Sequence, residues 1–266
     1  MKINLNIILG ISLFTFSANC QVPIQKADSL KRMMSVASKD TVKVNLLNKV
    51  ADLFKEINPD STTFYADKAL LIATPLKYTY GIGNAEINKG NANIILGNYP
   101  AALIHFLKAQ NQFENLVSEY PTEKSYNNCL ARSYASAGVV YSEQSNHYMA
   151  LEAYQKALKI YQENKQHSNI SKALNNIGIV YKAQQDNDKA LVYFKKAYQI
   201  QQEIAERNAP VTLTNIGVIY FEAHNYQLAL RYYNMAEKQF SKMDNKRGYA
   251  LLNNYFGDYY TKQKDS

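Results

Sequence analysis

The stretch that decides the fold runs from Leu174 to Ile200 and reads LNNIGIVYKAQQDNDKALVYFKKAYQI. A glycine, Gly178, stands in the middle of a segment that otherwise favours a helix. A glycine inside a helix costs about 1 kcal/mol relative to alanine, so its presence indicates that a second helix needs the space. If this interpretation is correct, the same pattern should recur along the chain.

The pattern recurs with a period of about forty residues. The glycines Gly138, Gly178 and Gly217 are 40 and 39 residues apart (178 − 138 and 217 − 178). Each has a small or bulky apolar residue before it, a tyrosine three residues later, and then an alanine, an aromatic residue and a second alanine. The residues that complete these three copies are Ala137, Tyr141, Ala150, Tyr154 and Ala157; Ile177, Tyr181, Ala190, Phe194 and Ala197; and Ile216, Tyr220, Ala229, Tyr233 and Ala236. Such a period, with fixed small and aromatic positions, is typical of an array of helical hairpins.

Weaker copies extend the array in both directions. Ala51 takes the place of the glycine in an earlier copy, whose turn is about one residue short, and Gly257 begins a last copy. A further copy starts at Gly90, where Asn93 stands in place of the tyrosine. The other repeat positions of these copies are Ala66 and Ala69; Gly97, Tyr99, Ala102, Phe106 and Ala109; and Phe256 and Tyr260.

These residues resemble the tetratricopeptide repeat, whose first helix carries a bulky residue, Leu-Gly and Tyr, and whose second helix carries Ala, Phe or Tyr, and Ala. The resemblance covers residues from about 44 to 266. The usual period is about 34 residues, so the helices here are longer, as in kinesin-light-chain-type repeats and bacterial peptide-sensing regulators. The resemblance implies an all-α, right-handed superhelical solenoid of helix-turn-helix repeats.

The predicted organisation has a leader, a short lead-in and the repeat array. Residues 1–20 form the leader and residues 21–43 the lead-in. Five repeats follow, at about 44–77, 83–116, 131–166, 171–206 and 210–245, and residues 250–266 form the first helix of an incomplete sixth repeat.

The leader predicts export from the cytoplasm. Its apolar run, from about Leu5 to Phe16, is shorter than the eighteen or so residues that a membrane-spanning helix needs, which favours a secretory signal. Cleavage after Cys20 would leave Gln21 as the new terminus. In the alternative, Cys20 carries a lipid that anchors a bacterial lipoprotein to a membrane. Both routes predict an extracytoplasmic protein, in the periplasm or cell envelope of a Gram-negative bacterium.

Catalysis and nucleic-acid binding find little support in the sequence. The four histidines lack a second ligand at metal spacing, and no phosphate-binding or nucleophile motif is present, so we expect no enzyme activity, metal or cofactor. The net charge of +8 comes from lysines scattered over the helices, which favours a solvated surface over a nucleic-acid site. The predicted partner is therefore a protein or a peptide.

The resemblance also implies a binding groove lined by the first helices. With the glycine counted as position eight, position six holds Asn88, Ser136, Asn176 and Asn215. An asparagine side chain has both a donor and an acceptor, so a row of them is suited to holding a peptide backbone. The apolar neighbours expected in the groove are Ile179, Val218 and Phe221, together with Ile87, Ile94 and Val139. The alternative is that the asparagines bond only within the solenoid.

The C-terminal helix leaves a second question open. Tyr255, Phe256, Tyr259 and Tyr260 lie on a predicted terminal helix with no second helix to cover them, so we expect a partner chain or self-association there. The stretch from Asp40 to Phe54 also resembles the start of extracytoplasmic sensor regions in Bacteroidetes signalling proteins. Two functions follow: a free-standing exported scaffold, or the input region of a histidine kinase or helix-turn-helix regulator that lacks its membrane helix and output domain.

Overall fold

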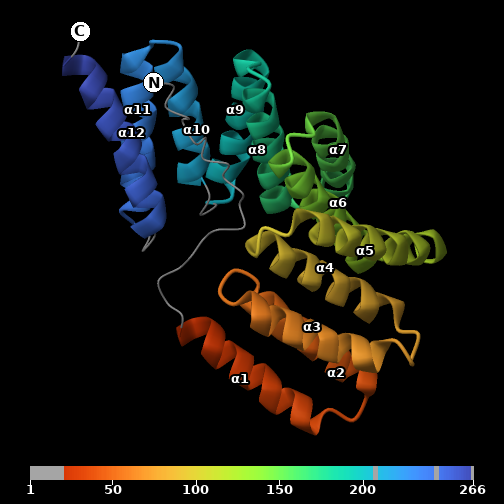
Figure 1. Cartoon of the computed structure of the whole chain (residues 1–266). Helices are drawn as coiled ribbons and strands as arrows, with labels where there is room; N and C mark the ends of the chain where they lie inside the picture. Colours follow the sequence, from red (N-terminus) through yellow and green to blue (C-terminus); the bar gives the residue numbers. More distant parts are fainter. Residues whose placement is uncertain (1–20, 206–208, 243–245, 265–266) are drawn as a thin grey trace. The chain divides into compact units, whose positions relative to one another are not determined.

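The computed structural model describes residues 21–205, 209–242 and 246–264, and within them every regular element is an α-helix. The predicted leader and Cys20 lie outside the described residues. The helices, shown in Figure 1, are α1 (Gln21–Val36), α2 (Asp40–Phe54), α3 (Pro59–Ala73), α4 (Thr79–Ile95), α5 (Tyr99–Glu119), α6 (Lys124–Glu143), α7 (His147–Glu163), α8 (His167–Ala183), α9 (Asn187–Glu203), α10 (Ala209–Glu222), α11 (Tyr226–Phe240) and α12 (Lys246–Lys264).

The helices pair into hairpins along the chain. Each of α2, α4, α6, α8 and α10 packs most extensively against the helix that follows it. The chain forms two compact units, and we describe each by itself: an N-terminal unit that ends at Asn164 and holds α1 to α7, and a C-terminal unit from Lys165 that holds α8 to α12. The fold is an all-α repeat solenoid. The right-handed superhelix of the whole chain stays a prediction.

The helix starts lie before the expected repeat starts. α6, for example, begins at Lys124, whereas the repeat pattern first becomes visible near residue 131. The opening turns carry no repeat position, so the pattern does not reveal them. The lead-in also holds a helix, α1, whose Ala27 is fully buried and which packs against α2.

The mid-helix glycines are explained by aromatic rings from the paired helix. A Cβ atom on Gly178 would lie 2.6 Å from Cε1 of Phe194, a distance that real Cβ atoms do not show. Phe194 is buried at the centre of its hairpin, so its ring has no free space into which to move. The same relation joins the remaining pairs in this position: Gly90 with Phe106, Gly138 with Tyr154, and Gly217 with Tyr233. The glycine therefore lets the two helices approach closely enough for the ring to lie against bare backbone.

The first hairpin, α2 with α3, has alanines in place of the glycine and the aromatic ring. Ala51 occupies the place of the glycine in α2, and the paired position in α3 holds Ala66 instead of a ring. Both alanines are fully buried in one cluster. In the other hairpins a glycine on the first helix faces an aromatic ring on the second. Here each helix contributes an alanine methyl group instead, and the two methyl groups fill the space between the helices.

The turns inside the hairpins share one backbone motif. Gly97, Ser145, Gln185 and His224 have positive φ angles, and each is followed by a residue that caps the second helix. The side chains of these caps, Asn98, Asn146, Asp186 and Asn225, accept hydrogen bonds from backbone amides three residues later, at 3.1–3.3 Å. Backbone bonds such as Asn146 N to Tyr141 O, at 2.8 Å, close the preceding helix. One motif thus ends the first helix and starts the second.

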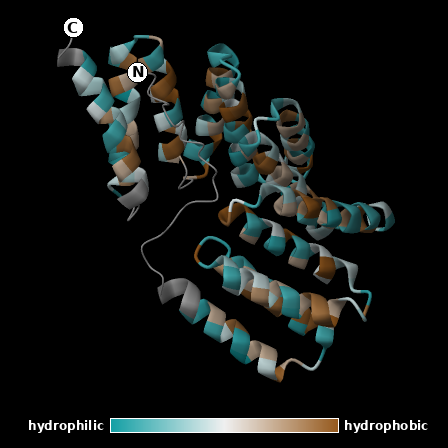
Figure 2. Cartoon of the chain, viewed as in Figure 1, coloured by the Kyte–Doolittle hydropathy of each residue, from teal (hydrophilic) through white to brown (hydrophobic). Residues whose placement is uncertain are grey.

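Hydrophobic and hydrophilic residues follow one another along the helices, as Figure 2 shows. Buried apolar residues from neighbouring helices form shared clusters. In the C-terminal unit, Leu213, Tyr233 and Leu252 form one buried cluster with neighbours from α10, α11 and α12. Tyrosines also stack within hairpins: the rings of Tyr181 and Tyr193 are 5.4 Å apart, and those of Tyr220 and Tyr232 are 5.5 Å apart. The tyrosine three residues after the glycine therefore contributes to packing between the paired helices.

One expectation for the C-terminal helix is wrong. Tyr255 and Tyr259 are expected to lack cover, but each is only 8% exposed. Tyr255 belongs to the core that α12 forms with α10 and α11, and Tyr259 lies against the ring of Tyr226 of α11. Phe256 is partly buried against the ring of Tyr233. Tyr260, by contrast, is 56% exposed.

Candidate functional site

Two of the three predicted groove asparagines, Asn88 and Asn215, bond to the neighbouring repeat. Asn88 Nδ2 donates to the backbone oxygen of Asn48 at 3.0 Å, and Asn215 Nδ2 donates to Oδ1 of Asn175 at 3.3 Å. The four side chains of these two pairs, Asn48, Asn88, Asn175 and Asn215, are buried. The bonds have the form that the alternative interpretation predicts, because they join successive first helices inside the solenoid. Asn176 is also buried, whereas Ser136 is partly exposed.

The apolar residues expected in the groove are mostly core residues. Ile179 packs with Phe194 and Ile216, and Val218 packs with Tyr233 and Leu252. The others in this group that are buried are Ile87, Ile94 and Val139. Phe221 is partly exposed and lies against Tyr226, with ring centres 5.5 Å apart. A ligand in contact with the first helices would therefore meet Ser136 and Phe221 more readily than these buried side chains.

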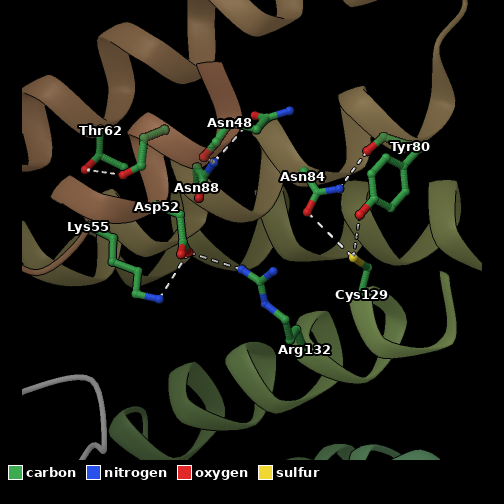
Figure 3. Close-up of polar contacts among 10 residues, drawn as sticks. Asn48, Asp52, Lys55, Thr62, Tyr80, Asn84, Asn88, Cys129 and Arg132 are labelled. Carbon is green, nitrogen blue, oxygen red and sulfur yellow. Dashed lines mark hydrogen bonds and ion pairs between the residues drawn. The ribbon is translucent and has the colours of Figure 1, made fainter. Parts of the chain in front are cut away.

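The N-terminal unit carries a polar face that the sequence did not predict. Its first helices are α2, α4 and α6, and α4 packs against both of the others. Arg132 of α6 reaches Asp52 of α2, with Nη2 3.3 Å from Oδ1, and Lys55 Nζ lies 3.1 Å from the same oxygen. Figure 3 shows these side chains converging from different helices. We call the partly exposed set Asp52, Asn84, Arg132 and Ser136 the N-terminal polar face.

The charges on this face are linked to one another. Burial alone would raise the pKa of the Asp52 carboxyl, but the charges of Lys55 and Arg132 outweigh it and hold that pKa below its usual range. Burial acts to lower the pKa of the Arg132 guanidinium, but the Asp52 charge, together with smaller contributions from Cys129, Tyr161 and Tyr80, raises that pKa above its usual value. Both groups are therefore charged at neutral pH. Their side chains are nevertheless 42% and 38% exposed, so a ligand can reach them.

A second group of contacts lies beside the ion pair. The Cys129 thiol of α6 donates to Oδ1 of Asn84 at 3.6 Å, and its sulfur lies 4.0 Å from the Tyr80 hydroxyl (Figure 3). Burial raises the pKa of the Cys129 thiol and raises the pKa of the Tyr80 phenol to about 12. The thiol is therefore protonated at neutral pH and is a poor nucleophile. In the described structure Cys129 is a packing residue that helps to position Asn84.

The sequence does not reveal the pair of Asp52 and Arg132 directly, because the two residues are 80 positions apart and belong to different repeats. Their positions within the repeats nevertheless indicate that they lie on the same face. Counted as before, Asp52 is at position nine of the first repeat and Arg132 at position two of the third, and both positions face the same side of a first helix. A charged residue at such a position in each of two nearby repeats would have suggested the pair.

Within the described ranges, 21–205, 209–242 and 246–264, no group of three or more His, Cys, Asp or Glu side chains is arranged to hold a metal ion. No helix in this part of the chain is long and apolar enough to cross a membrane.

Comparison with known proteins identifies the repeats. The sequence profile of the family described as Tetratricopeptide repeat matches residues 129–203 and, in a second overlapping match, 169–242. The chain is a tetratricopeptide-repeat protein. These matches run from within α6 to just beyond α11. The glycine and aromatic pairs of α4 with α5 continue the same packing outside the matched residues. No curated protein matches the sequence significantly.

Solved tetratricopeptide-like structures share the fold. BtubC (BKLC) from P. vanneervenii is 18% identical, with a TM-score of 0.66, over 83% of this chain and 89% of that one. A Rap protein complexed with Competence and Sporulation Factor is 15% identical, with a TM-score of 0.65, over 92% and 72%. The STAND protein PH0952 from Pyrococcus horikoshii, which has a tetratricopeptide repeat sensor, is 17% identical, with a TM-score of 0.63, over 91% of this chain and 40% of that one. At such identities the likeness shows the fold alone.

Proposed function

We propose that this protein is a non-catalytic scaffold that binds a protein or peptide segment on the first helices of its repeats. Tetratricopeptide repeats typically build protein-binding scaffolds, and the match to the repeat profile and the hairpin packing support this role for the chain. The Rap protein complexed with Competence and Sporulation Factor supports the proposal, because it shows a related fold together with a bound partner.

The observation that carries the proposal is the half-exposed ion pair between Asp52 and Arg132. A salt bridge formed for stability alone gains little at the surface, typically less than about 1 kcal/mol. Here it joins α2 to α6 while both charged groups remain accessible. Asn84 on the intervening helix α4 and Ser136 on α6 add amide and hydroxyl groups to the same polar face. Such a mixture of charges and hydrogen-bonding groups suits a peptide backbone with polar side chains.

Binding to this face is tested by peptide selection. Peptides from a displayed random library are selected on the full chain and then titrated individually by fluorescence anisotropy. Arg132→Gln should weaken their binding at least tenfold, because it removes a charge at the centre of the face. Lys68→Gln, on the second helix α3, is the matched control and should leave binding unchanged. Failure to select any peptide, or equal binding to both variants, would overturn the proposal.

Export and envelope localisation belong to the same proposal. They rest on the apolar leader and on Cys20, which lie outside the described residues, so the lipid anchor stays an alternative to simple cleavage. The intact mass of the protein from its native cell, with the cell fraction recorded, distinguishes these cases. A soluble species beginning at Gln21 supports cleavage and export, a lipid-bearing species beginning at Cys20 supports the anchor, and an uncleaved cytoplasmic chain contradicts both.

The second candidate function is that of a ligand-sensing input region. The similarity to PH0952 favours it, because that protein is described as carrying a tetratricopeptide repeat sensor and this chain spans 40% of its length. On this reading the same polar face binds the signal, and an output domain responds to it. A much larger, membrane-bound species in the mass measurement would support the sensor over the free-standing scaffold.

A further inference from the structure

The second helices α3 and α5 of the N-terminal unit expose large apolar side chains to solvent. Four such side chains, each between 46% and 77% exposed, are Phe64 and Leu71 of α3 and Ile104 and Leu107 of α5. The opposite side of each helix carries the alanines that are buried in its hairpin. The exposed apolar residues therefore contribute nothing to the core of the unit.

A lysine holds the same repeat position in both helices. Lys68 and Lys108 are 40 residues apart (108 − 68), and each directly precedes the second conserved-spacing alanine of its hairpin, Ala69 or Ala109. The hairpins α2 with α3 and α4 with α5 follow one another, and α4 packs against both α2 and α3. Figure 1 shows α3 and α5 on either side of α4. Equivalent positions on α3 and α5 therefore face the same side of the unit.

Helical spacing places each lysine among the apolar side chains. Lys68 is four residues after Phe64 and three before Leu71, so these three residues form one stripe along α3. The Nζ atom of Lys68 lies 4.3 Å from the centre of the Phe64 ring. A matching stripe on α5 has the same kinds of side chain, and apolar residues gathered in this way mark an interaction site. We call the two stripes together the outer face, which consists of Phe64, Lys68, Leu71, Ile104, Leu107 and Lys108.

The positive charges of the outer face are not neutralised within the protein. Asp67, the acidic neighbour of Lys68 in the sequence, accepts instead from Lys89 of α4, with Oδ1 2.7 Å from Nζ. Among residues 21–205, 209–242 and 246–264, neither Lys68 nor Lys108 forms an ion pair. The outer face therefore combines exposed apolar groups with an excess of positive charge.

The third hairpin shows that the repeat itself does not require such a face. Lys156 of α7 also precedes the second alanine of its hairpin, but Glu152 stands four residues before it, where α3 and α5 have Phe64 and Ile104. The Glu152 carboxylate pairs with Lys156 at 2.8 Å. The corresponding surface of α7 is thus polar and neutralised. Among these three second helices, only α3 and α5 join apolar side chains to unpaired lysines.

We propose that the outer face binds the surface of a lipid bilayer that contains anionic phospholipids. Its apolar side chains enter the boundary between headgroups and acyl chains, where they leave water. The stems of the lysines lie along this apolar surface while their ammonium groups reach the lipid phosphates. Because the surface potential of such a bilayer is negative, it attracts the lysines and holds the apolar side chains in place.

The lysines distinguish a bilayer from a protein partner. The centres of interfaces between proteins are depleted in lysine, whereas Lys68 stands between Phe64 and Leu71 in the middle of its stripe. A second copy of this chain would bring lysines of like charge against one another, which is unfavourable. The N-terminal polar face belongs to first helices and shares no residue with the outer face.

The test is sedimentation of the full chain with lipid vesicles. Vesicles of phosphatidylglycerol and phosphatidylcholine in equal parts are compared with vesicles of phosphatidylcholine alone. Binding should be at least about tenfold stronger to the anionic vesicles, and it should weaken as the NaCl concentration rises. Absence of binding to the anionic vesicles, or equal binding to both kinds, overturns the proposal.

Two double variants separate the apolar and the charged contributions. Phe64→Ser with Leu71→Ser removes the apolar side chains of α3, and Lys68→Gln with Lys108→Gln removes both charges. Each should weaken binding to the anionic vesicles at least about tenfold. Circular dichroism should show unchanged helicity, because all four side chains are exposed.

Matched controls come from α7 of the same unit. Tyr148→Ser removes a ring that is exposed, and Lys156→Gln with Lys159→Gln changes the net charge by the same amount as the lysine variant. Both controls should bind as the wild type does. The predicted leader is identical in all of these proteins, so binding through it would leave every variant equal to the wild type. Such equality overturns the proposal, and so does an equal loss in the controls. Self-association without lipid that Phe64→Ser with Leu71→Ser abolishes also overturns it, in favour of a second copy.

Discussion

Asn215 donates a hydrogen bond from Nδ2 to Oδ1 of Asn175, and the two residues lie forty positions apart on successive first helices. Asn88 makes the equivalent bond to Asn48 in the N-terminal unit, to the backbone oxygen, again over forty positions. In both units a side chain at position six of one repeat is thus anchored at position five of the repeat before it. Asn88 and Asn215 thus link neighbouring repeats, and each uses its side-chain amide for a bond inside the solenoid.

This bond predicts a cost in stability. Thr212 Oγ1 also donates to Oδ1 of Asn175, at 3.1 Å, so Asn175→Ala should leave two buried donors without their acceptor. We expect the free energy of unfolding to fall by about 1–3 kcal/mol. Urea denaturation measures the change. Asn253→Ala, at an exposed position of α12, is the control and should change stability by less than about 0.5 kcal/mol.

The packing of glycine against aromatic rings predicts opposite effects of one substitution at two sites. Gly178→Ala introduces a Cβ atom 2.6 Å from Phe194, so it should destabilise the protein by about 1–3 kcal/mol through overpacking. Gly257→Ala meets no neighbour and should stabilise it by up to about 1 kcal/mol through helix propensity. Thermal melts of the two variants test the sign, and equal shifts would contradict the packing argument.

The turns predict a stabilising substitution. Gln185 has a φ angle of 64°, in the left-handed region that glycine adopts at no steric cost and other residues adopt with strain. Gly97 occupies the same turn position with a φ angle of 72°. Gln185→Gly should therefore raise stability by about 0.5–1 kcal/mol, whereas Gly97→Ala should lower it by a similar amount. A melting temperature that falls in the first variant would show that the Gln185 side chain contributes more than its backbone strain costs.

The ion pair between Asp52 and Arg132 predicts a pH-dependent coupling. Because the pKa of Asp52 lies below its ordinary value of 3.8, the folded state favours the charged carboxylate. Its contribution is therefore present above about pH 4 and is lost as the pH falls through the lowered pKa. For a pair this exposed, a double-mutant cycle with Asp52→Asn and Arg132→Gln should give about 0.5 kcal/mol at pH 7. The coupling should fall toward zero as the pH drops through the lowered pKa, and a coupling that persists once the carboxyl is protonated would exclude a charge interaction.

The buried thiol predicts slow alkylation. Burial raises the pKa of Cys129, so at pH 8 it should react with iodoacetamide more than tenfold more slowly in the native protein than in the unfolded chain. Peptide mapping by mass spectrometry follows this residue separately from Cys20. Similar rates in the two states would show that the packing of Cys129 against Tyr80 and Asn84 opens readily.

The sequence also marks the turns between the paired helices. The caps Asn98, Asn146, Asp186 and Asn225 recur eight residues after each glycine, directly behind the left-handed turn residue. An Asn or Asp at that spacing signals the start of the second helix, and it would have placed the turns from the sequence alone. The helix α1 had no such signal, because its residues carry none of the repeat positions.

The amino-acid sequence by itself determined the all-helical fold, the hairpin period and the close approach of a second helix at Gly178. These depend on residues close together in the chain, because the two helices of a hairpin are joined by a short turn that sets their alignment. Only the tertiary structure decided that Arg132 reaches Asp52, that Asn215 is bonded to Asn175, and that Tyr255 is buried while Tyr260 is exposed. Those contacts depend on the rotation between successive hairpins, which side-chain packing along the whole unit determines and no local pattern encodes.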